Sequence, residues 1–231
     1  NRSLPQPLCC REGKKMIGEF FLISWKINNR IAEVFNNSKD KILDLGCGSN
    51  PSYHKSMKGK IICLDIIKTN KTHIISDADK LPFKPNSFDK IISVNSFYYF
   101  KNPFNVVKSI NKILKKGGKL VLVLPFYYPI HDAPDDKYRF TEYGLRTLLE
   151  NDFRIERIET IGGIFNMPAV ILHSLIKGIP LLFSKEIIKF IQILTYILWP
   201  IYIIAQLFSI LDIFDRTKRF PTYYFVVAEK K

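Results

Sequence analysis

The feature that most constrains the fold is an alternation of short apolar runs with longer helical patterns. Each run is rich in β-branched residues and is bounded by Gly, Pro, Asn or Asp, as is typical of buried strands. Five such runs stand at residues 41–46, 60–65, 73–76, 88–94 and 118–125. Between the last two, residues 103–116 place apolar side chains on one helical face, opened by Asn102 and closed by Gly117. Strand–helix–strand connections of this kind are parallel and right-handed, so the sequence predicts an open, doubly wound α/β sheet.

Four further elements extend this pattern. A helical pattern at residues 16–35 precedes the first strand, and Thr141 opens another helix that runs to Glu150. Residues 154–160 alternate like a strand, and residues 223–229 form an apolar run near the C-terminus. We therefore expect a mostly parallel seven-stranded sheet in which an apolar helical insertion precedes the last strand.

A second constraint is the stretch from Phe190 to Leu211, which carries no charge. Its length favours a membrane span, because about 20 apolar residues cross a bilayer. A single crossing would, however, leave residues 223–229 on the wrong side of the membrane from the sheet that they should join. Pro200 also interrupts the stretch as a single helix. An even number of crossings, a re-entrant hairpin or a helix lying in the interface remains compatible with the fold, and we predict a peripheral attachment through residues 164–214. The alternative is that these helices pack on the sheet or form a dimer interface.

The charge of the chain indicates an anionic partner. Lys and Arg number 35 against 21 Asp and Glu, which gives a net charge of +14. Such an excess favours contact with nucleic acid, phospholipid or a phosphorylated substrate, and charge alone does not choose among them. Basic residues that flank the apolar stretch would face an anionic inner leaflet, each adding roughly 1 kcal/mol of attraction. They are Lys185, Lys189, Arg216, Lys218 and Arg219.

The four cysteines do not predict a metal site or a disulfide framework. Cys9 and Cys10 are adjacent near the start of the chain, whereas Cys47 and Cys63 fall in segments expected to be buried β-structure. This arrangement favours reduced thiols, and we expect no bound metal.

The loops that leave the predicted strands carry the chemistry, since ligands of such sheets bind at the carboxyl ends of the strands. The first loop contains Gly46 and Gly48, whose lack of a Cβ lets the backbone turn tightly and approach a ligand. The second strand ends in Asp65, a carboxylate that can accept both hydroxyls of a ribose. Asp77 and Ala78 follow the third strand. A short glycine motif alone is a weak signal, but these features occur together and in order.

With its motifs LDLGCGxxP, D-A-x-x-LPF and FDxIIS, the chain resembles the class I S-adenosylmethionine-dependent methyltransferases. The resemblance covers roughly residues 40–160, with the last strand rejoining near residue 223. It implies a Rossmann-like fold and S-adenosylmethionine as the cofactor. The residues that it places around the cofactor are Asp44, Gly46 and Gly48 at the methionine part, Asp65 at the ribose, Asp77 and Ala78 at the adenine and Asn95 beside the sulfonium, with Cys47 and Ile66 completing the set.

A dinucleotide-binding dehydrogenase is the closest competitor, because it too ends its second strand in an acid. Its fingerprint G-x-G-x-x-G opens a helix around a pyrophosphate. Here Pro51 stands at the third position after Gly48, and no helix start is set up for a phosphate. A cofactor without phosphates suits the acid-rich loops better.

The loop at residues 125–145 holds the first catalytic candidate. It resembles the P-x-H-x-x-P-x-D-x-x-R-F-T-x-x-G-L segment of methyltransferases that accompany cell-surface polysaccharide genes. In it, His131 can take a proton from an acceptor hydroxyl; the alternative is a histidine that only hydrogen-bonds its own loop. Charged side chains of this loop would either contact the substrate or hold the loop together; they are Asp132, Asp135, Asp136 and Arg139. Of the two roles we favour the second for Arg139, as an ion pair with Asp136.

The end of the fourth strand departs from many of these relatives. They carry a Glu-His pair where this chain has Tyr98 and Tyr99, so the role of that pair is not carried over, and Tyr99 becomes the second catalytic candidate. The chain also lacks the Asn/Asp-Pro-Pro-aromatic tetrad with which amino-methylating enzymes hold a flipped-out base. Nucleic acid is therefore not favoured as the acceptor.

The resemblance and the apolar stretch together predict an enzyme that O-methylates a sugar or a lipid-linked glycan. The alternatives are methylation of a lipophilic small molecule such as a quinone or isoprenoid, and a cofactor-binding scaffold without catalysis. We expect a cytoplasmic protein held peripherally on the inner face of an anionic membrane, with a homodimer as an open option. Its parts would be a helical segment at 1–38, a methyltransferase core at 39–163 and 220–231, and the insertion at 164–219.

Overall fold

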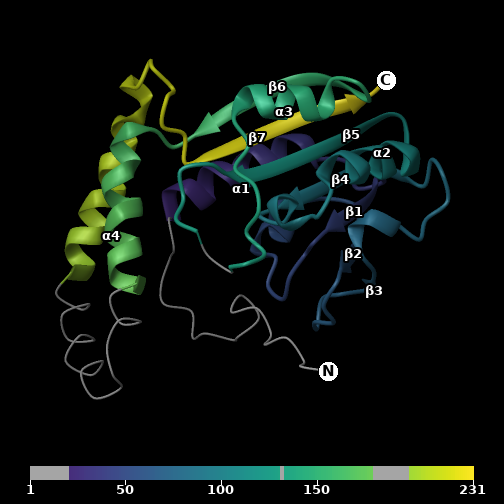
Figure 1. Ribbon diagram of the computed structural model, residues 1–231, viewed down its shortest axis with the longest axis horizontal. Helices are drawn as coiled ribbons and strands as arrows, with labels where there is room; N and C mark the ends of the chain where they lie inside the picture. The colour runs from purple at the N-terminus through teal and green to yellow at the C-terminus, as the bar shows by residue number, and fades with distance from the viewer. Residues whose placement is uncertain (1–20, 131–132, 179–197) are drawn as a thin grey trace.

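The computed structural model describes residues 21–130, 133–178 and 198–231, which form a seven-stranded sheet with helices on both faces (Figure 1). The order across the sheet is β3-β2-β1-β4-β5-β7-β6, and only β7 runs antiparallel to its neighbours. The predicted doubly wound, mostly parallel sheet is therefore confirmed. The strands are β1 Lys41–Leu45, β2 Lys60–Asp65, β3 Ile74–Ile75, β4 Phe88–Val94, β5 Leu114–Pro125, β6 Phe153–Ile161 and β7 Tyr223–Lys230.

Two apolar cores lie on the two faces of the sheet, because successive side chains of a buried strand point to opposite sides. Leu120 and Leu122 of β5 pack with one core, and Val121 and Val123 with the other. The first core is covered by α2 Pro103–Ile113 and α3 Glu142–Leu149. The second is covered by α1 Phe21–Val34, α4 Met167–Gly178 and the helical residues 198–208.

The predicted starts of two helices are confirmed by their caps. The side chain of Asn102 accepts a hydrogen bond from Asn105 N at the start of α2, and Thr141 accepts one from Gly144 N at the start of α3. These bonds satisfy amides that have no partner within the helix.

The predicted end of α2 is wrong by three residues. The helix ends at Ile113 rather than at residue 116, and Gly117 lies inside β5 instead of closing the helix. The carbonyls of Lys112 and Ile113 accept hydrogen bonds from the amides of Asn86 and Ser87. Because this neighbouring turn satisfies the end of the helix, no glycine cap is needed, and the chain passes directly into the strand.

The helical insertion stands at one end of the sheet, where α4 and residues 198–208 lie side by side (Figure 1). The rings of His173 and Tyr202, one from each helix, have centroids 5.8 Å apart. The chain then passes through the 3₁₀ helix η7 Ser209–Phe214 and enters β7. No helix in the part of the chain that the structure describes is both long and apolar enough to cross a membrane. Residues 190–197 of the stretch at 190–211 lie outside the described residues.

Candidate active site

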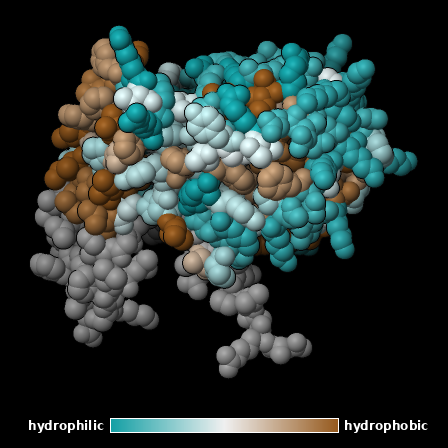
Figure 2. Space-filling model, turned by 45° about the horizontal axis from the view of Figure 1, so that its top comes forward, coloured by the Kyte–Doolittle hydropathy of each residue, from teal (hydrophilic) through white to brown (hydrophobic). Residues whose placement is uncertain are grey.

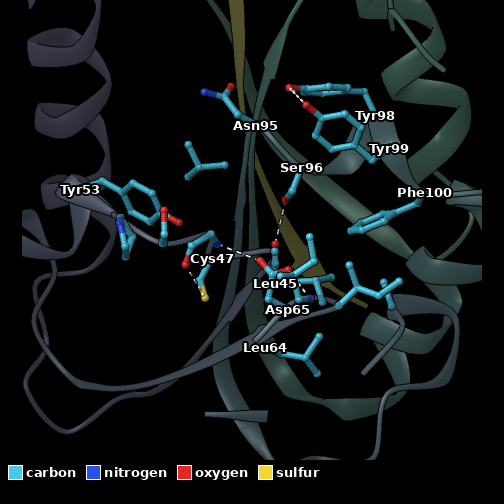
Figure 3. A pocket seen from close by; sticks show the side chains of 18 of the residues that line it. Leu45, Cys47, Tyr53, Leu64, Asp65, Asn95, Ser96, Tyr98, Tyr99 and Phe100 are labelled. Carbon is cyan, nitrogen blue, oxygen red and sulfur yellow. Dashed lines mark hydrogen bonds between the residues drawn. The ribbon is translucent and has the colours of Figure 1, made fainter. Parts of the chain in front are cut away.

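A cavity of about 820 Å³ opens at the carboxyl edge of the sheet, over the junction of β1 and β4 (Figure 3). At this junction the strand order reverses, which is where open α/β sheets bind ligands. Ser96, directly after β4, donates a hydrogen bond from Oγ to the carbonyl of Leu45 at 2.8 Å and fixes the two strand ends together. A Cβ on Gly46 would lie 2.5 Å from the Cβ of Ser96, so only glycine fits at this position.

The glycine loop is held against the end of β2 by Asp65. Its Oδ2 accepts from the amide of Gly48 at 2.8 Å, and its Oδ1 accepts from the amide of Ile67 at 3.0 Å. Gly46 and Gly48 both have positive φ, +77° and +62°, which strains any other residue type. No atom lies within 4 Å of a Cβ built on Gly48, so this loop leaves room for a ligand. A carboxylate has about four acceptor sites, and two amides therefore leave Asp65 able to accept ribose hydroxyls.

The cavity brings together most of the site residues expected from the sequence. Those that line it are Gly46, Cys47, Gly48, Asp65, Ile66, Asp77, Ala78, Asn95 and Tyr99. Two do not. Asp44 is fully buried beneath the glycine loop and is not among the lining residues, and His131 lies outside the described residues.

Asp44 is held from below by two neighbours that sequence reasoning did not find. Its Oδ2 accepts from the hydroxyl of Tyr53 at 2.7 Å and meets Nε2 of His54 at 2.6 Å. Both belong to the 3₁₀ helix η2 Ser52–Ser56, which follows the glycine loop. Burial raises the pKa of Asp44, while the hydrogen bonds from His54 and Tyr53 act in the opposite direction. The sequence signal for this arrangement was the position of Tyr53 and His54, which follow Asp44 within ten residues and can both hydrogen-bond a carboxylate.

The remaining loops shape the opposite end of the cavity. Asp77 caps the 3₁₀ helix η3 Ala78–Lys80, and its Oδ1 accepts from the amide of Asp79 at 3.1 Å, which leaves its second oxygen for a ligand. Asn95 adopts a left-handed φ of 52° at the end of β4, a conformation that asparagine tolerates better than most residues. Its exposed side chain stands across the cavity from Tyr53 (Figure 3).

An aromatic wall with polar groups forms the side of the cavity away from the acidic loops. Tyr98 and Tyr99 of the 3₁₀ helix η4 Phe97–Tyr99 lie with ring centroids 4.3 Å apart and planes tilted by 44°, and the Tyr98 hydroxyl donates to that of Tyr99 (Figure 3). Tyr128, Asp135 and Lys137 add to this wall from the loop after β5. Asp135 was expected from the sequence to contact the substrate or hold the loop together, whereas Tyr128 and Lys137 were not predicted to lie at the cavity.

The loop after β5 is docked onto η4. The amide of Lys137 donates to the carbonyl of Tyr98 at 3.3 Å, and its Nζ donates to the carbonyl of Tyr99 at 3.2 Å. Arg139 pairs with Asp136, as expected, with Nη2 and Oδ2 at 2.6 Å, and its guanidinium lies 5.3 Å from the centre of the Tyr98 ring. The loop residues that touch the cavity are thereby fixed relative to Tyr98 and Tyr99.

Cys47 and Cys63 are free thiols beside the same loop. A hydrogen bond from Cys47 lowers the pKa of Cys63 to about 6. The same interaction raises the pKa of Cys47.

Comparison with known proteins identifies the domain. Residues 43–122 match the family described as a methyltransferase domain. The uncharacterized protein MJ0638 of Methanocaldococcus jannaschii is 27% identical over 166 residues, which cover 68% of this chain and 70% of that protein. The ubiquinone/menaquinone biosynthesis C-methyltransferase UbiE of Wigglesworthia glossinidia brevipalpis is 32% identical over 117 residues. These cover 42% of this chain and 46% of that enzyme, so the chain spans less than half the length of this relative.

A solved structure has a similar fold. It is a phosphoethanolamine N-methyltransferase of Haemonchus contortus in complex with phosphomonomethylethanolamine and S-adenosylhomocysteine, with a TM-score of 0.56 at 15% identity. The match covers 89% of this chain and 52% of that one. The domain match and the site geometry agree: residues 43–122 belong to a methyltransferase domain, and the cavity lies at the carboxyl edge of its sheet.

Proposed function

We propose that this S-adenosylmethionine-dependent methyltransferase methylates a hydroxyl group of a sugar or of a lipid-linked glycan. The observation that carries the proposal is the two-sided cavity. Acidic, glycine-containing loops line one side, and a wall of tyrosines with Asp135 and Lys137 lines the other. Tyrosine rings offer flat apolar faces with a polar tip, and carboxylate and ammonium groups bind hydroxyls. This combination suits a sugar ring, which has both apolar faces and hydroxyl edges.

The residues of the first side fit the cofactor. Gly48 leaves the backbone open beside the methionine part, and Gly46 allows the loop to pack closely against Ser96. Asp65 has acceptor sites for the ribose, and Asp77 has a carboxylate oxygen without a partner among the described residues for the adenine amino group. Asp44 supports the loop from below through Tyr53 and His54. When bound, S-adenosylmethionine supplies an electrophilic methyl group on a positively charged sulfur.

The residues of the second side orient the acceptor and receive its proton. An acceptor hydroxyl loses its proton when its oxygen becomes an ether, and His131 is the base in this proposal. Tyr99 lines the cavity, and its hydroxyl accepts from Tyr98, so it is placed to hold the acceptor oxygen in line. Lys137 and Asp135, joined by an ion pair of 2.9 Å, lie at the same wall.

We propose further that residues 164–219 attach the enzyme to an anionic lipid surface, that 39–163 and 220–231 form the catalytic core, and that 1–38 is a separate N-terminal segment. An apolar surface covers the outer side of the insertion (Figure 2). Its most exposed members are Ile201, Ile204, Phe208, Ile210, Ile213 and Phe214, each more than half exposed. Monomeric soluble proteins rarely expose an apolar patch of this extent without a partner.

Two features favour a lipid surface as that partner. Polar side chains of the insertion point inward, where Gln206, Ser209 and Asp212 are buried. This polarity suits an apolar environment outside the helices. Exposed Arg216, Lys218 and Arg219 follow η7 directly, and each basic residue near an anionic surface adds roughly 1 kcal/mol of attraction. A dimer interface would use the apolar residues but gives the basic ones no role.

A second candidate acceptor is a quinone or another isoprenoid. The relative from Wigglesworthia is named as a C-methyltransferase of ubiquinone and menaquinone biosynthesis. The tyrosine wall and a lipid-facing insertion would also suit a lipophilic ring. In this second candidate the methyl group is transferred to a carbon atom of the acceptor, whereas in the first it is transferred to an oxygen atom.

The test is turnover with separated cell fractions. Protein and methyl-labelled cofactor are incubated with total lipid, lipid-linked glycan and soluble sugar fractions, and labelled products are located by mass spectrometry. We expect label on a glycan oxygen, and His131→Ala should lower turnover by roughly 10²–10⁴ while leaving cofactor affinity unchanged. Label only on a quinone ring carbon would replace the proposal by the second candidate. Turnover at the parent level in His131→Ala would remove that residue from the mechanism.

A further inference from the structure

A cluster of metal-binding side chains lies beneath the glycine loop. Asp44 at the end of β1, His54 in η2 and Cys63 in β2 each offer one ligand atom, and these atoms all lie within 4.8 Å of one another. Parallel pairing of β1 with β2 sets Asp44 directly beside Cys63, and η2 folds back so that His54 reaches both. Residues from three elements thus converge, although their spacing in the sequence matches no common metal motif.

One oxygen of the carboxylate in this cluster is buried without a hydrogen-bond partner among the described residues. Asp44 is fully buried, and within the described residues its Oδ1 has no hydrogen-bond partner. The other oxygen, Oδ2, takes both the Tyr53 hydroxyl and His54. A buried carboxylate oxygen without a donor is destabilising, so it indicates that a cation or another donor belongs there.

We propose that Asp44, His54 and Cys63 bind a zinc ion. Zinc accepts all three ligand types, with bonds of about 2.0–2.3 Å that set the ligand atoms about 3–4 Å apart. The cluster needs to contract by about 1 Å to reach this geometry, and His54, whose side chain is 20% exposed, has the freedom to move. On binding, the Cys63 thiol loses its proton to solvent, and His54 binds as a neutral imidazole through Nε2 with its ring proton on Nδ1. Three protein ligands leave the fourth position to water.

A zinc ion at this point would act on the cofactor loop without touching the acceptor. The amides of Gly46 and Cys47 already donate to the carbonyl of Leu64, next to Cys63. A metal bond between Asp44 and Cys63 would stiffen this connection under the glycine loop. The ion is therefore structural in this proposal, and the identity of the acceptor does not bear on it.

The experiment measures zinc binding in a Cys9→Ser/Cys10→Ser background, so that no thiol near the N-terminus contributes. The chelator-stripped protein is titrated with zinc against a competing chromophoric chelator. We expect one zinc per chain, and His54→Ala and Cys63→Ser should each lower its affinity by more than about 100-fold. Tyr53→Phe, which removes a partner of the ligand Asp44, should lower it by about 10–100-fold.

His173→Ala is the matched control, because His173 is a histidine of α4 in the insertion and is not part of the cluster. It should keep the parent affinity. Cobalt in place of zinc adds a spectroscopic readout: the parent should show thiolate-to-cobalt absorption that Cys63→Ser lacks. Circular dichroism checks that each variant is folded. The proposal is overturned if the folded parent binds no stoichiometric zinc, or if folded His54→Ala and Cys63→Ser bind it as tightly as the parent.

Discussion

In the sheet, the inward residues of β4 and β5 are almost all apolar, whereas η7 of the insertion turns Ser209 and Asp212 inward and Ile213 and Phe214 outward. Across the described residues, seven of the eleven buried polar or charged side chains belong to residues 166–222. The same part of the chain, 164–220, supplies twelve of the nineteen exposed large hydrophobic side chains. The insertion therefore differs from the sheet in burying several polar side chains and exposing many apolar ones, although Val170 and Ile176 still pack into the second core.

This difference separates two tasks. The sheet follows the usual rule for a protein surrounded by water, and its loops form a polar cavity for a charged cofactor. The insertion buries polar groups and exposes apolar ones, which is the pattern expected if, as proposed, an apolar medium lies outside its helices. Changes in the sheet should therefore alter cofactor binding and leave attachment intact, and changes in the insertion should do the reverse.

The largest effect on the sheet side is expected for Gly46→Ala. The new Cβ would lie 2.5 Å from the Ser96 Cβ at a φ of +77°, and the left-handed conformation alone is unfavourable by about 1–2 kcal/mol. Calorimetry should show binding of S-adenosylmethionine weakened by more than about 100-fold, with vesicle binding unchanged. Adding Ser96→Gly removes the clashing atoms and should restore part of the affinity. If Gly46→Ala and Gly46→Ala/Ser96→Gly bind the cofactor equally weakly, then the close contact between Gly46 and Ser96 does not determine the shape of the loop.

A smaller effect is expected for Asp65→Ala. Hydrogen bonds to a charged acceptor are worth roughly 1.5–3 kcal/mol, which corresponds to about one to two decades in affinity. Asp65→Asn keeps the shape and one acceptor oxygen, and it should lie between the parent and Asp65→Ala. Parent-like calorimetric binding in Asp65→Ala would exclude the ribose assignment.

The smallest effect concerns the buried polar groups of the insertion. Neither the amide nitrogen nor the amide oxygen of Gln206 has a hydrogen-bond partner in the described structure, so Gln206→Leu should raise the free energy of unfolding by about 1 kcal/mol. Asn166 is the matched control, since its Nδ2 donates to Thr222 at 2.7 Å and Asn166→Leu should destabilise. Chemical denaturation measures both. Destabilisation by Gln206→Leu would show that this glutamine has a partner of its own, such as ordered water.

The sequence predicted the sheet and its cofactor edge because those features are local. Glycines predict turns, β-branched runs predict strands, and an acid at a strand end predicts a ligand contact, each at its own position in the sequence. Strand pairing then brings these positions together at one edge of the sheet. The partners of Asp44 could not be predicted in this way, since Tyr53 and His54 reach it only after η2 folds back. The same holds for Lys137 at the tyrosine wall, which is placed there by docking of the loop on η4.

The end of α2 shows a second limit of sequence reasoning. Gly117 has the positive φ typical of a helix cap, +71°, but uses it within β5. A distant turn had already satisfied the last carbonyls of the helix. In the insertion, the sequence predicted apolar helices but did not predict which side chains would face outward, because that depends on the packing of α4 against residues 198–208.

The central claim, that the insertion and not the sheet meets the lipid, is tested most directly by flotation with vesicles containing an anionic phospholipid. Ile213 and Phe214 are 79% and 72% exposed on η7, and Tyr143, 79% exposed on α3, is the matched control. We expect the parent and Tyr143→Glu to float with the vesicles, and Ile213→Glu/Phe214→Glu to stay behind with unchanged affinity for S-adenosylmethionine. Each lost apolar contact is worth up to roughly 1.5–3 kcal/mol, so binding should fall by at least about tenfold. The proposed lipid attachment is contradicted if the parent protein does not bind the vesicles and sediments as a compact dimer. It is also contradicted if Ile213→Glu/Phe214→Glu floats like the parent.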